Sequence, residues 1–474
     1  MPAASNPPLP VQEASIQAHS AALRRELGIV DLVLAQILLV IVPDFFGTAV
    51  KAGPAHVSLW LAAILLFFIP LGLVVAHLNR LMPLEGGLYE WARLAFNDQI
   101  GFLVAWNLWL FIMLYVAVIG LVTTTSVAYA IPSLAWIADS RWAVLAASVL
   151  LIALQMLLAA VGFSVGKWFN NAGSIAVLIT VGILIGLPLM NSWRGNLSAF
   201  HPLRLAAPPL TVFTLSVFSK MTFGALSGFE YVAIFAGESH NPSRNIARSI
   251  LITAPLIAAI YILTTGSILA YVSPDAVDVI GPIPQALRAG FGRIGSVIVP
   301  VAIFLLLMNY LSTFSLYFSG SARLPMTAGW DHLLPGWFSR LHARFKTPVN
   351  SILFLGGATL AASVAALIGV GAQEAYELLL TWGFTFYGIA YLALFAIPLL
   401  ARKNSGIRPG TGLRLAAASG FVVTLLFVVL SIFPIIRVES ESLYSWKIAG
   451  VVVGANLLGW MIYLAGRRKS AASA

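Results

Sequence analysis

The sequence IVDLVLAQILLVIVPDFFGTAV, residues 29–50, decides the fold of this chain. As a helix with a rise of about 1.5 Å per residue it would be about 33 Å long, enough to cross the core of a bilayer. Pro43 and Gly47 do not suit a continuous helix, and Asp44 would cost about 3 kcal/mol or more if its carboxylate faced lipid. A break in a membrane helix is tolerated only where protein or water satisfies the freed backbone groups, so we predict a broken helix that lines a buried site.

The composition is that of a membrane protein. The chain has 474 residues, of which 60% are apolar and 9% are charged, whereas a soluble protein carries about 25% charged residues. We therefore predict an all-α polytopic membrane protein. There is no cysteine, so the chain can form neither a disulfide nor a cysteine metal site. Residues 1–26 are polar and lack the apolar core of a signal peptide, which predicts a disordered cytoplasmic tail.

Twelve apolar stretches predict twelve spanning helices with both termini in the cytoplasm. Eighteen of the 27 lysine and arginine residues fall on the side of the termini, eight fall on the other side, and Lys220 lies within a span. Cytoplasmic loops carry the excess of positive charge, so this asymmetry predicts a multi-pass protein of the cytoplasmic (inner) membrane. The net charge of +10 then meets anionic lipid, and no other feature favours a nucleic-acid partner. The predicted spans are residues 29–50, 57–79, 101–131, 141–162, 170–190, 211–236, 247–272, 294–319, 349–369, 375–401, 414–435 and 446–466.

A second interrupted helix lies in residues 211–236. Gly224 and Gly228 interrupt its apolar run, with Lys220 one turn before the break and Glu230 directly after it. Helices 1 and 6 are thus both broken near the middle of the membrane, five helices apart. Two matched broken helices are typical of an inverted five-helix repeat with a substrate site at its pseudo-twofold axis.

Four motifs carry a resemblance to a known family. They are P-x-E-G-G-x-Y-x-W at residues 83–91, S-G-F-E at 227–230, E-S-x-N-P-x-R-N-I at 238–246, and S-A-R-L-P-M with the later L-P and K-T-P at 321–348. With these motifs in this order, the chain resembles the amino acid–polyamine–organocation (APC) superfamily, in particular its bacterial amino acid and polyamine permeases. The resemblance implies the LeuT-type fold, in which twelve transmembrane helices contain a five-plus-five inverted repeat and helices 1 and 6 are broken.

The resemblance also implies an organisation and a function. Beyond the tail, we expect a first five-helix repeat at residues 27–190, a second at 191–401, and helices 11 and 12 with a cytoplasmic C-terminus at 402–474. A protein of this kind would be a secondary active transporter. It would move an amino acid or related amine by alternating access, as a proton symporter or as an exchanger.

Backbone groups exposed at the two breaks are the candidates for binding the substrate. The N-terminus of a half helix suits a carboxylate and exposed carbonyl groups suit an ammonium group, and an α-amino acid has both. The alternative is a packing kink that binds no ligand. Phe223 and Phe229 flank the second break, where either could close over the substrate as a gate or serve only in packing. The backbone candidates are Gly47, Thr48 and Ala49 at the first break and Gly224, Ser227 and Gly228 at the second.

Three charged side chains are candidates for coupling and gating. Asp44 would bind a substrate ammonium or guanidinium group or carry the coupled proton, unless it is a solvated aspartate at the helix end. Glu230 occupies the position of a glutamate that the resemblance links to proton coupling, although it could instead only satisfy backbone donors at the break. Lys220 would pair with Asp44 in the empty site and favour a substrate carboxylate, or it would extend outward as a bystander.

Further polar and aromatic residues are weaker candidates. Some proton-coupled relatives place a lysine thirteen residues after the position of Lys167, where this chain has Thr180, so it lacks that device. Thr180, together with Ser312 and Thr313 in helix 8, could supply hydroxyl oxygens to sodium, beside carbonyl groups of helix 1. The candidate walls of the pocket are Trp106, Trp109, Asn309, Tyr310, Tyr387 and Tyr391.

Proton-coupled symport of a zwitterionic or cationic amino acid, or of an amine, is the favoured function, with the proton as coupling ion and no cofactor or metal. An exchanger is the second interpretation, and a receptor that uses the transporter fold without transport is a different class. An enzyme is not indicated, because the seven histidines are scattered and form no i, i+4 pair. The expected partners are the substrate and the lipid bilayer, with the chain acting as a monomer or homodimer.

Overall fold

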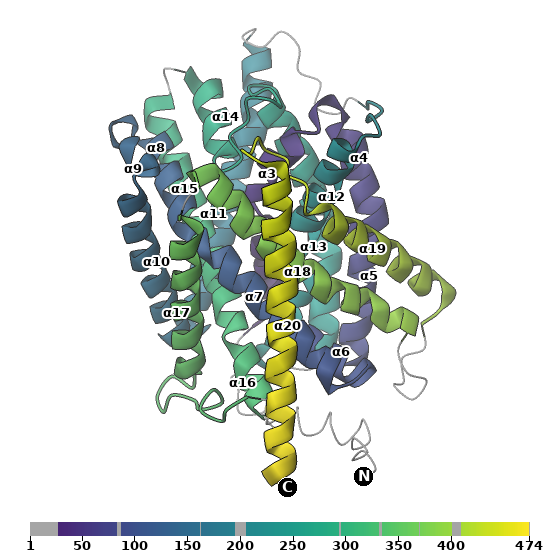
Figure 1. Ribbon diagram of the computed structural model, residues 1–474. Coiled ribbons are helices and arrows are strands. Elements are labelled where there is room, and N and C mark those ends of the chain that lie inside the picture. The colour runs from purple at the N-terminus through teal and green to yellow at the C-terminus, as the bar shows by residue number, and fades with distance from the viewer. Residues whose placement is uncertain are drawn as a thin grey trace.

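The protein is a bundle of long helices (Figure 1). In the part of the chain that the structure describes, eleven helices are long and apolar enough to span a membrane, and the bent pair α2 and α3 makes up a twelfth span. The predicted all-α fold with twelve spans is therefore confirmed. The computed structural model describes residues 27–82, 87–161, 163–194, 205–292, 295–330, 334–368, 370–400 and 409–473.

The helices follow one another along the chain, and several spans combine two or more of them. The second span joins α4, a π-helical segment and α5, and the third joins α7 and α8. The helices are α2 (Ile29–Val40), α3 (Asp44–Val50), α4 (His56–Ala63), α5 (Ile69–Leu81), α6 (Leu88–Ala95), α7 (Asp98–Ala117), α8 (Ile119–Ala130), α9 (Trp136–Asp139), α10 (Arg141–Val161), α11 (Phe163–Trp193), α12 (Val212–Leu226), α13 (Pro242–Leu269), α14 (Pro282–Phe291), α15 (Gly295–Ser321), α16 (Arg323–Trp330), α17 (Val349–Ala366), α18 (Ala372–Leu400), α19 (Thr411–Leu430) and α20 (Glu441–Ser473). The shorter segments are the 3₁₀ helices η1 (Gly53–Ala55), η3 (Pro132–Leu134) and η4 (Phe229–Glu238) and the π-helix η2 (Ile64–Phe68).

The two broken helices pack together inside the bundle. α3 packs against α12, and α2 packs against α11, α13, α15 and η4. α18 packs against α7 and α19, while α20 runs along the outside and contacts α7 and α18 (Figure 1). The breaks therefore lie among helices on all sides. The division of the chain into repeats at residues 190/191 and 401/402 remains a prediction.

The first break lies between α2 and α3, at residues 41–43, and bends the span by 51°. Pro43 has no N–H to continue the helical hydrogen bonds. The hydroxyl of Tyr261, on α13, donates to the carbonyl of Val40 at 2.7 Å and accepts from the N–H of Val42 at 2.9 Å. One phenol thus satisfies a freed acceptor and a freed donor of the same break.

Two hydroxyl groups of α15 cover the carbonyls that precede this break. Tyr317 donates to the carbonyl of Leu39 at 3.0 Å, and Thr313 lies 3.3 Å from the carbonyl of Leu38. Both hydroxyls come from the same face of α15, because residues four apart lie above one another on a helix. The broken end of α2 is therefore held by side chains rather than left for water.

The second break follows Leu226, where α12 ends and the chain continues as the 3₁₀ helix η4. Gly228 has φ = +123°, a region that favours glycine. A Cβ on this residue would also lie 3.2 Å from the carbonyl oxygen of Leu39. Its N–H donates to the hydroxyl of Tyr391 at 2.8 Å. The two breaks are consequently in direct contact, with Gly228 against the end of α2.

Two other glycines permit close contact within the half helices rather than at the breaks. A Cβ on Gly224 would lie 2.0 Å from Cε1 of Phe45, so the Phe45 ring occupies the space directly over that glycine. A Cβ on Gly47 would lie 3.0 Å from Cα of Val279. Gly47 belongs to α3 and Gly224 to α12, so the expectation that they form the broken backbone is wrong.

Replacing Gly224 with alanine is expected to destabilise the protein, because the added methyl group would overlap the Phe45 ring. Overpacking of this kind costs about 1–3 kcal/mol. Gly182 of α11 is the matched control, because a Cβ there would meet no atom within 4 Å. In detergent, Gly224→Ala should lower the thermal unfolding midpoint while Gly182→Ala leaves it unchanged or raises it. Equal midpoints for the two variants would contradict the proposed close contact.

Candidate functional site

Asp44 begins α3 and is buried, with 2% of its surface exposed. Tyr376, on α18, donates to Oδ1 at 2.5 Å, and Tyr115, on α7, donates to Oδ2 at 3.2 Å. The hydroxyl of Tyr310, on α15, is a third phenol close to the same carboxyl group. Asp44 is therefore no solvated end of a helix but a carboxylate enclosed by phenols from three other helices.

Glu230 follows the second break and is equally buried, with 1% exposed. Tyr387 and Tyr391, on α18, donate to its two carboxylate oxygens. The Tyr391 hydroxyl also accepts the N–H of Gly228, so it connects the carboxylate to the broken backbone. Each break thus carries one buried carboxylate that is held by tyrosines.

Aromatic rings fill the space between the two carboxylates. Phe111 stacks on Tyr387, with ring centroids 4.0 Å apart, and on Tyr115, at 5.7 Å. These two tyrosines bind different carboxylates, so Phe111 lies between the two groups. Phe384 packs edge-on to Phe111 at 5.0 Å and to Phe45 at 4.7 Å. A substrate between the carboxylates would meet aromatic faces, which attract cations.

Lys220 forms a buried ion pair with Glu377 and not with Asp44. Its Nζ lies 2.9 Å from Oε1 of Glu377, and the two side chains are 5% and 7% exposed. The pairing expected between Lys220 and Asp44, and the alternative that the lysine extends outward, are both wrong for this structure. Glu377 directly follows Tyr376 on α18. Neighbouring residues of this helix therefore bind both α3, through Asp44, and α12, through Lys220.

A second lysine lies near the same glutamate. Lys51 directly follows α3 and is half-buried. Burial lowers the pKa of its ammonium group from the ordinary value, and the negative charges of Glu377 and Asp275 oppose this shift. Glu377 therefore carries the negative charge that balances cations at this end of the bundle.

The expected substrate-binding backbone is only partly at the breaks. Gly47, Thr48 and Ala49 lie inside α3, where helical hydrogen bonding continues. Ser227 and Gly228 do form the second break, and the buried hydroxyl of Ser227 has no hydrogen-bond partner among the described residues. Ser227 is consequently the one predicted position that offers a free polar group at a break.

The two phenylalanines considered as gates are packed in the core. Phe223 stacks on Phe427 of α19 at 4.5 Å, and Phe229 stacks on Phe68 at 4.9 Å. Both rings are fully buried. The packing alternative therefore describes both residues in this structure, while Phe45 is the ring that lies over Gly224.

The predicted pocket walls separate into two groups. Tyr310, Tyr387 and Tyr391 face the carboxylates, as described above. Asn309 points instead toward α11, with its amide nitrogen 3.4 Å from the carbonyl of Gly173. Trp106 donates to the carbonyl of Ala455 on α20, and Trp109 stacks on Phe354 of α17 at 5.4 Å. The two tryptophans therefore belong to the periphery of the bundle and not to the central site.

The hydroxyl groups considered for sodium do not converge. Thr313 lies beside the Leu38 carbonyl as expected, but the Ser312 hydroxyl donates to the carbonyl of Phe169 at 3.0 Å. Thr180 donates to the carbonyl of Ala176, within its own helix. No cluster of three or more histidine, aspartate or glutamate side chains suited to a metal occurs within the described ranges.

Three residues of the site were not identified from the sequence. Tyr115 and Tyr376 resemble the many other aromatic residues of membrane helices, so no pattern marks them. Glu377 does leave a signal, because it is an acidic residue inside the predicted span 375–401. An acidic residue within one span and a lysine within another, Lys220, would have suggested an ion pair between them.

The fold and the paired breaks are those of a transporter with discontinuous helices at its centre. Comparison with known proteins agrees with this class. The sequence model described as "Amino acid permease" matches residues 28–454, and the chain belongs to this family.

Named relatives are all distant. The chain is 27% identical to the branched-chain amino acid permease BcaP of Bacillus subtilis, over 76% of this chain and 80% of the relative. It is 22% identical to a probable agmatine/putrescine antiporter of Lactococcus lactis, over 79% of this chain and 78% of the relative. An uncharacterized transporter of Legionella pneumophila is 24% identical, over 81% of this chain and 83% of the relative.

Removing one member of the Lys220–Glu377 pair is expected to destabilise the protein strongly. Lys220→Met would leave a buried carboxylate without its cation, which costs about 3–5 kcal/mol. The double variant Lys220→Met/Glu377→Gln removes both charges and should recover most of that loss. Chemical unfolding of the purified variants in detergent measures the three stabilities. A single variant as stable as the wild type would show that the pair contributes nothing.

Proposed function

We propose that the chain transports an amino acid or related amine whose positively charged amino group binds Asp44, and that Glu230 carries a coupled proton. The observation that carries this proposal is the pair of buried carboxylates, one at each break, each hydrogen-bonded by phenols. Within the described ranges neither carboxylate forms an ion pair. A buried carboxylate of this kind can be neutralised by a substrate cation or by a proton.

The charges around the site favour a substrate that carries a positive charge. The buried lysine closest in sequence to the second break, Lys220, is already neutralised by Glu377. It is therefore not free to bind a substrate carboxylate. Phe111 and Phe384 add aromatic surfaces that attract an ammonium group. Zwitterionic amino acids with an ammonium group, cationic amino acids and small amines all meet this requirement.

The two carboxylates suit different roles because their surroundings differ. Asp44 accepts hydrogen bonds from phenols of α7 and α18 and lies near a third phenol on α15, so a ligand bound there would contact three helices at once. Glu230 is bound through Tyr391 to the backbone of the second break. Adding or removing a proton at Glu230 would change the hydrogen bonds of that break directly. Glu230 is for this reason the better candidate for the proton carrier.

The relatives support transport of this substrate class. One is a branched-chain amino acid permease and another is a probable agmatine/putrescine antiporter. The antiporter supports exchange as a second candidate for the mode of transport. We place the protein in the cytoplasmic membrane, with both termini in the cytoplasm, because lysine and arginine are concentrated on that side.

Asp44→Asn is expected to reduce uptake of the substrate about tenfold or more, because a hydrogen bond to a charged group contributes about 1.5–3 kcal/mol. The substrate is first identified by a thermal-shift screen of amino acids and polyamines with the wild-type protein. Uptake into proteoliposomes then compares the variants. Glu374→Gln is the control, because Glu374 is also on α18 but pairs with Lys447 outside the site. Unchanged uptake by Asp44→Asn would remove Asp44 from the binding site.

Glu230→Gln is expected to separate substrate movement from proton coupling. Glutamine keeps the shape of the side chain but cannot release the proton. Accumulation driven by an imposed pH gradient should be lost, while counterflow against substrate inside the vesicles should persist. A wild-type protein that moves substrate only when substrate is present on both sides, at any pH gradient, would instead be an exchanger.

A further inference from the structure

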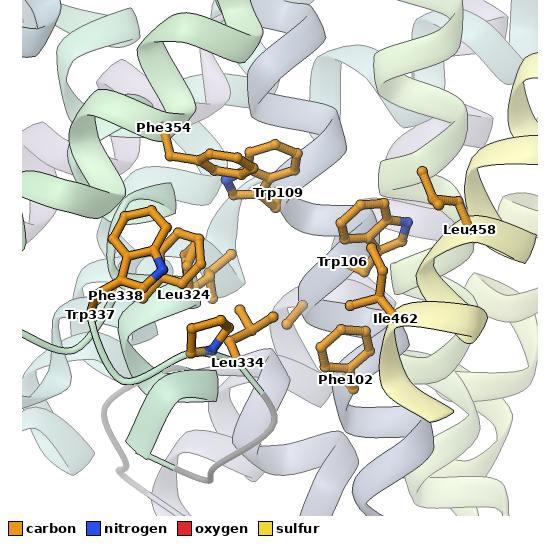
Figure 2. A pocket seen from close by; sticks show the side chains of 13 residues that line it. Phe102, Trp106, Trp109, Leu324, Leu334, Trp337, Phe338, Phe354, Leu458 and Ile462 are labelled. Atoms are coloured by element: carbon orange, nitrogen blue, oxygen red, sulfur yellow. The ribbon is translucent and has the colours of Figure 1, made fainter. Parts of the chain in front are cut away.

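A cavity of about 390 Å³ lies between α7, α16, α17 and α20, away from the carboxylates (Figure 2). Thirteen apolar or aromatic residues line it, and six of them carry aromatic rings: Phe102, Trp106, Trp109, Trp337, Phe338 and Phe354. Small-molecule sites have volumes of about 300–1,000 Å³, so the cavity is large enough for a ligand. The wholly apolar lining excludes the charged substrate proposed above.

Hydrogen bonds and ring contacts fix the walls of the cavity. Trp337 stacks on Phe338 with centroids 3.9 Å apart. The carbonyl groups of these two residues accept from α17, Trp337 from the amide of Asn350 at 2.8 Å and Phe338 from the hydroxyl of Ser351 at 3.4 Å. Trp109 stacks on Phe354. The cavity is thus a shaped site whose loop wall is bound to the helix behind it.

One polar group in the wall lacks a partner. Trp109 is 7% exposed, and its indole N–H has no hydrogen bond in the described structure. Figure 2 shows Trp109 at one end of the cavity. A buried donor without an acceptor costs about 1–3 kcal/mol. An oxygen atom of a bound ligand would remove this cost.

The cavity borders the part of the protein surface that faces lipid. Phe354 and Leu458 line it and remain 47% exposed each, on helices whose apolar residues cover the outside of the bundle. Ile462, also in the wall, lies five residues before Arg467, which is about 7.5 Å along α20. The cavity therefore lies within acyl-chain depth, close to one membrane surface.

Positively charged residues follow two wall elements of the cavity closely in the sequence. Arg340, Arg344 and Lys346 follow the wall residue Phe338 within eight positions, and all three are exposed. Arg467 and Arg468 are exposed at the end of α20. Lysine and arginine near a membrane surface attract anionic lipid by about 1 kcal/mol each. The site thus combines an apolar cavity, one hydrogen-bond donor and a cluster of cations.

We infer that this cavity binds an anionic phospholipid of the adjacent leaflet. One acyl chain fills the space between the aromatic rings, an ester carbonyl accepts the N–H of Trp109, and the phosphate group lies among the arginine and lysine side chains. The inference concerns the periphery of the bundle and holds whatever the central site transports.

Native mass spectrometry of the full-length protein tests this inference. The protein is stripped of lipid in detergent and titrated separately with dioleoyl phosphatidylglycerol, dioleoyl phosphatidylcholine, oleic acid and glycerol phosphate. The wild type should retain phosphatidylglycerol about fivefold or more better than each of the other three. Equal retention of phosphatidylcholine would contradict the role of the arginine and lysine side chains. Equal retention of oleic acid would contradict the inference that the ligand is a phospholipid.

Two variants and one control locate the binding. Ala105→Phe places a ring in the cavity and should remove most of the retained phosphatidylglycerol. Trp109→Phe replaces the indole with a smaller ring that has no N–H donor, and should weaken retention about threefold or more. Trp142→Phe is the control, because Trp142 is 82% exposed at the start of α10. Thermal unfolding in lipid-free detergent checks that the variants fold. If Ala105→Phe does not fold, the retention measured for Trp109→Phe tests the inference. Retention equal to the wild type in the folded variants would overturn the inference.

Discussion

Backbone groups at the two helix breaks must find hydrogen bonds in a region without free access to water, and the rest of the structure depends on this constraint. Tyrosine hydroxyl groups provide these hydrogen bonds. Tyr261 bridges the first break, Tyr317 covers the end of α2, and Tyr391 accepts the N–H of Gly228. These tyrosines come from α13, α15 and α18, so satisfying the breaks also fixes where three neighbouring helices lie. The transport helices can be broken because the surrounding helices carry hydroxyl groups at the right positions.

The same helix that satisfies one break also joins both half helices to the outside of the site. On α18, Tyr376 binds Asp44 of α3 and the next residue, Glu377, binds Lys220 of α12. About three turns further along, Tyr387 begins the set that holds Glu230. α18 is thus hydrogen-bonded to both carboxylates. A coupling mechanism requires such a shared element, whose position both sites can influence.

The sequence predicted the architecture more fully than the contacts. Helix-breaking residues at Pro43 and Gly228 mark the breaks, because backbone chemistry depends on residue type and can be recognised locally. The partners of Lys220 could not be recognised in this way. Lys220 and Glu377 are 157 positions apart, and only the packing of α12 against α18 brings them together. The role of a glycine is equally hard to predict from sequence. Gly224 suggests a break in the helix, but in the structure it makes room for the ring of Phe45.

The hydrogen bond between Tyr376 and Asp44 has a consequence for affinity. A ligand that requires the Asp44 carboxylate would bind only those protein molecules in which this hydrogen bond has opened. Its apparent dissociation constant is the intrinsic one divided by the fraction of such molecules, so a fraction of about 1% would weaken binding roughly a hundredfold. The Tyr376–Asp44 hydrogen bond would therefore lower the affinity for such a ligand. A transporter gains from this, because a substrate held too tightly would be released too slowly for turnover.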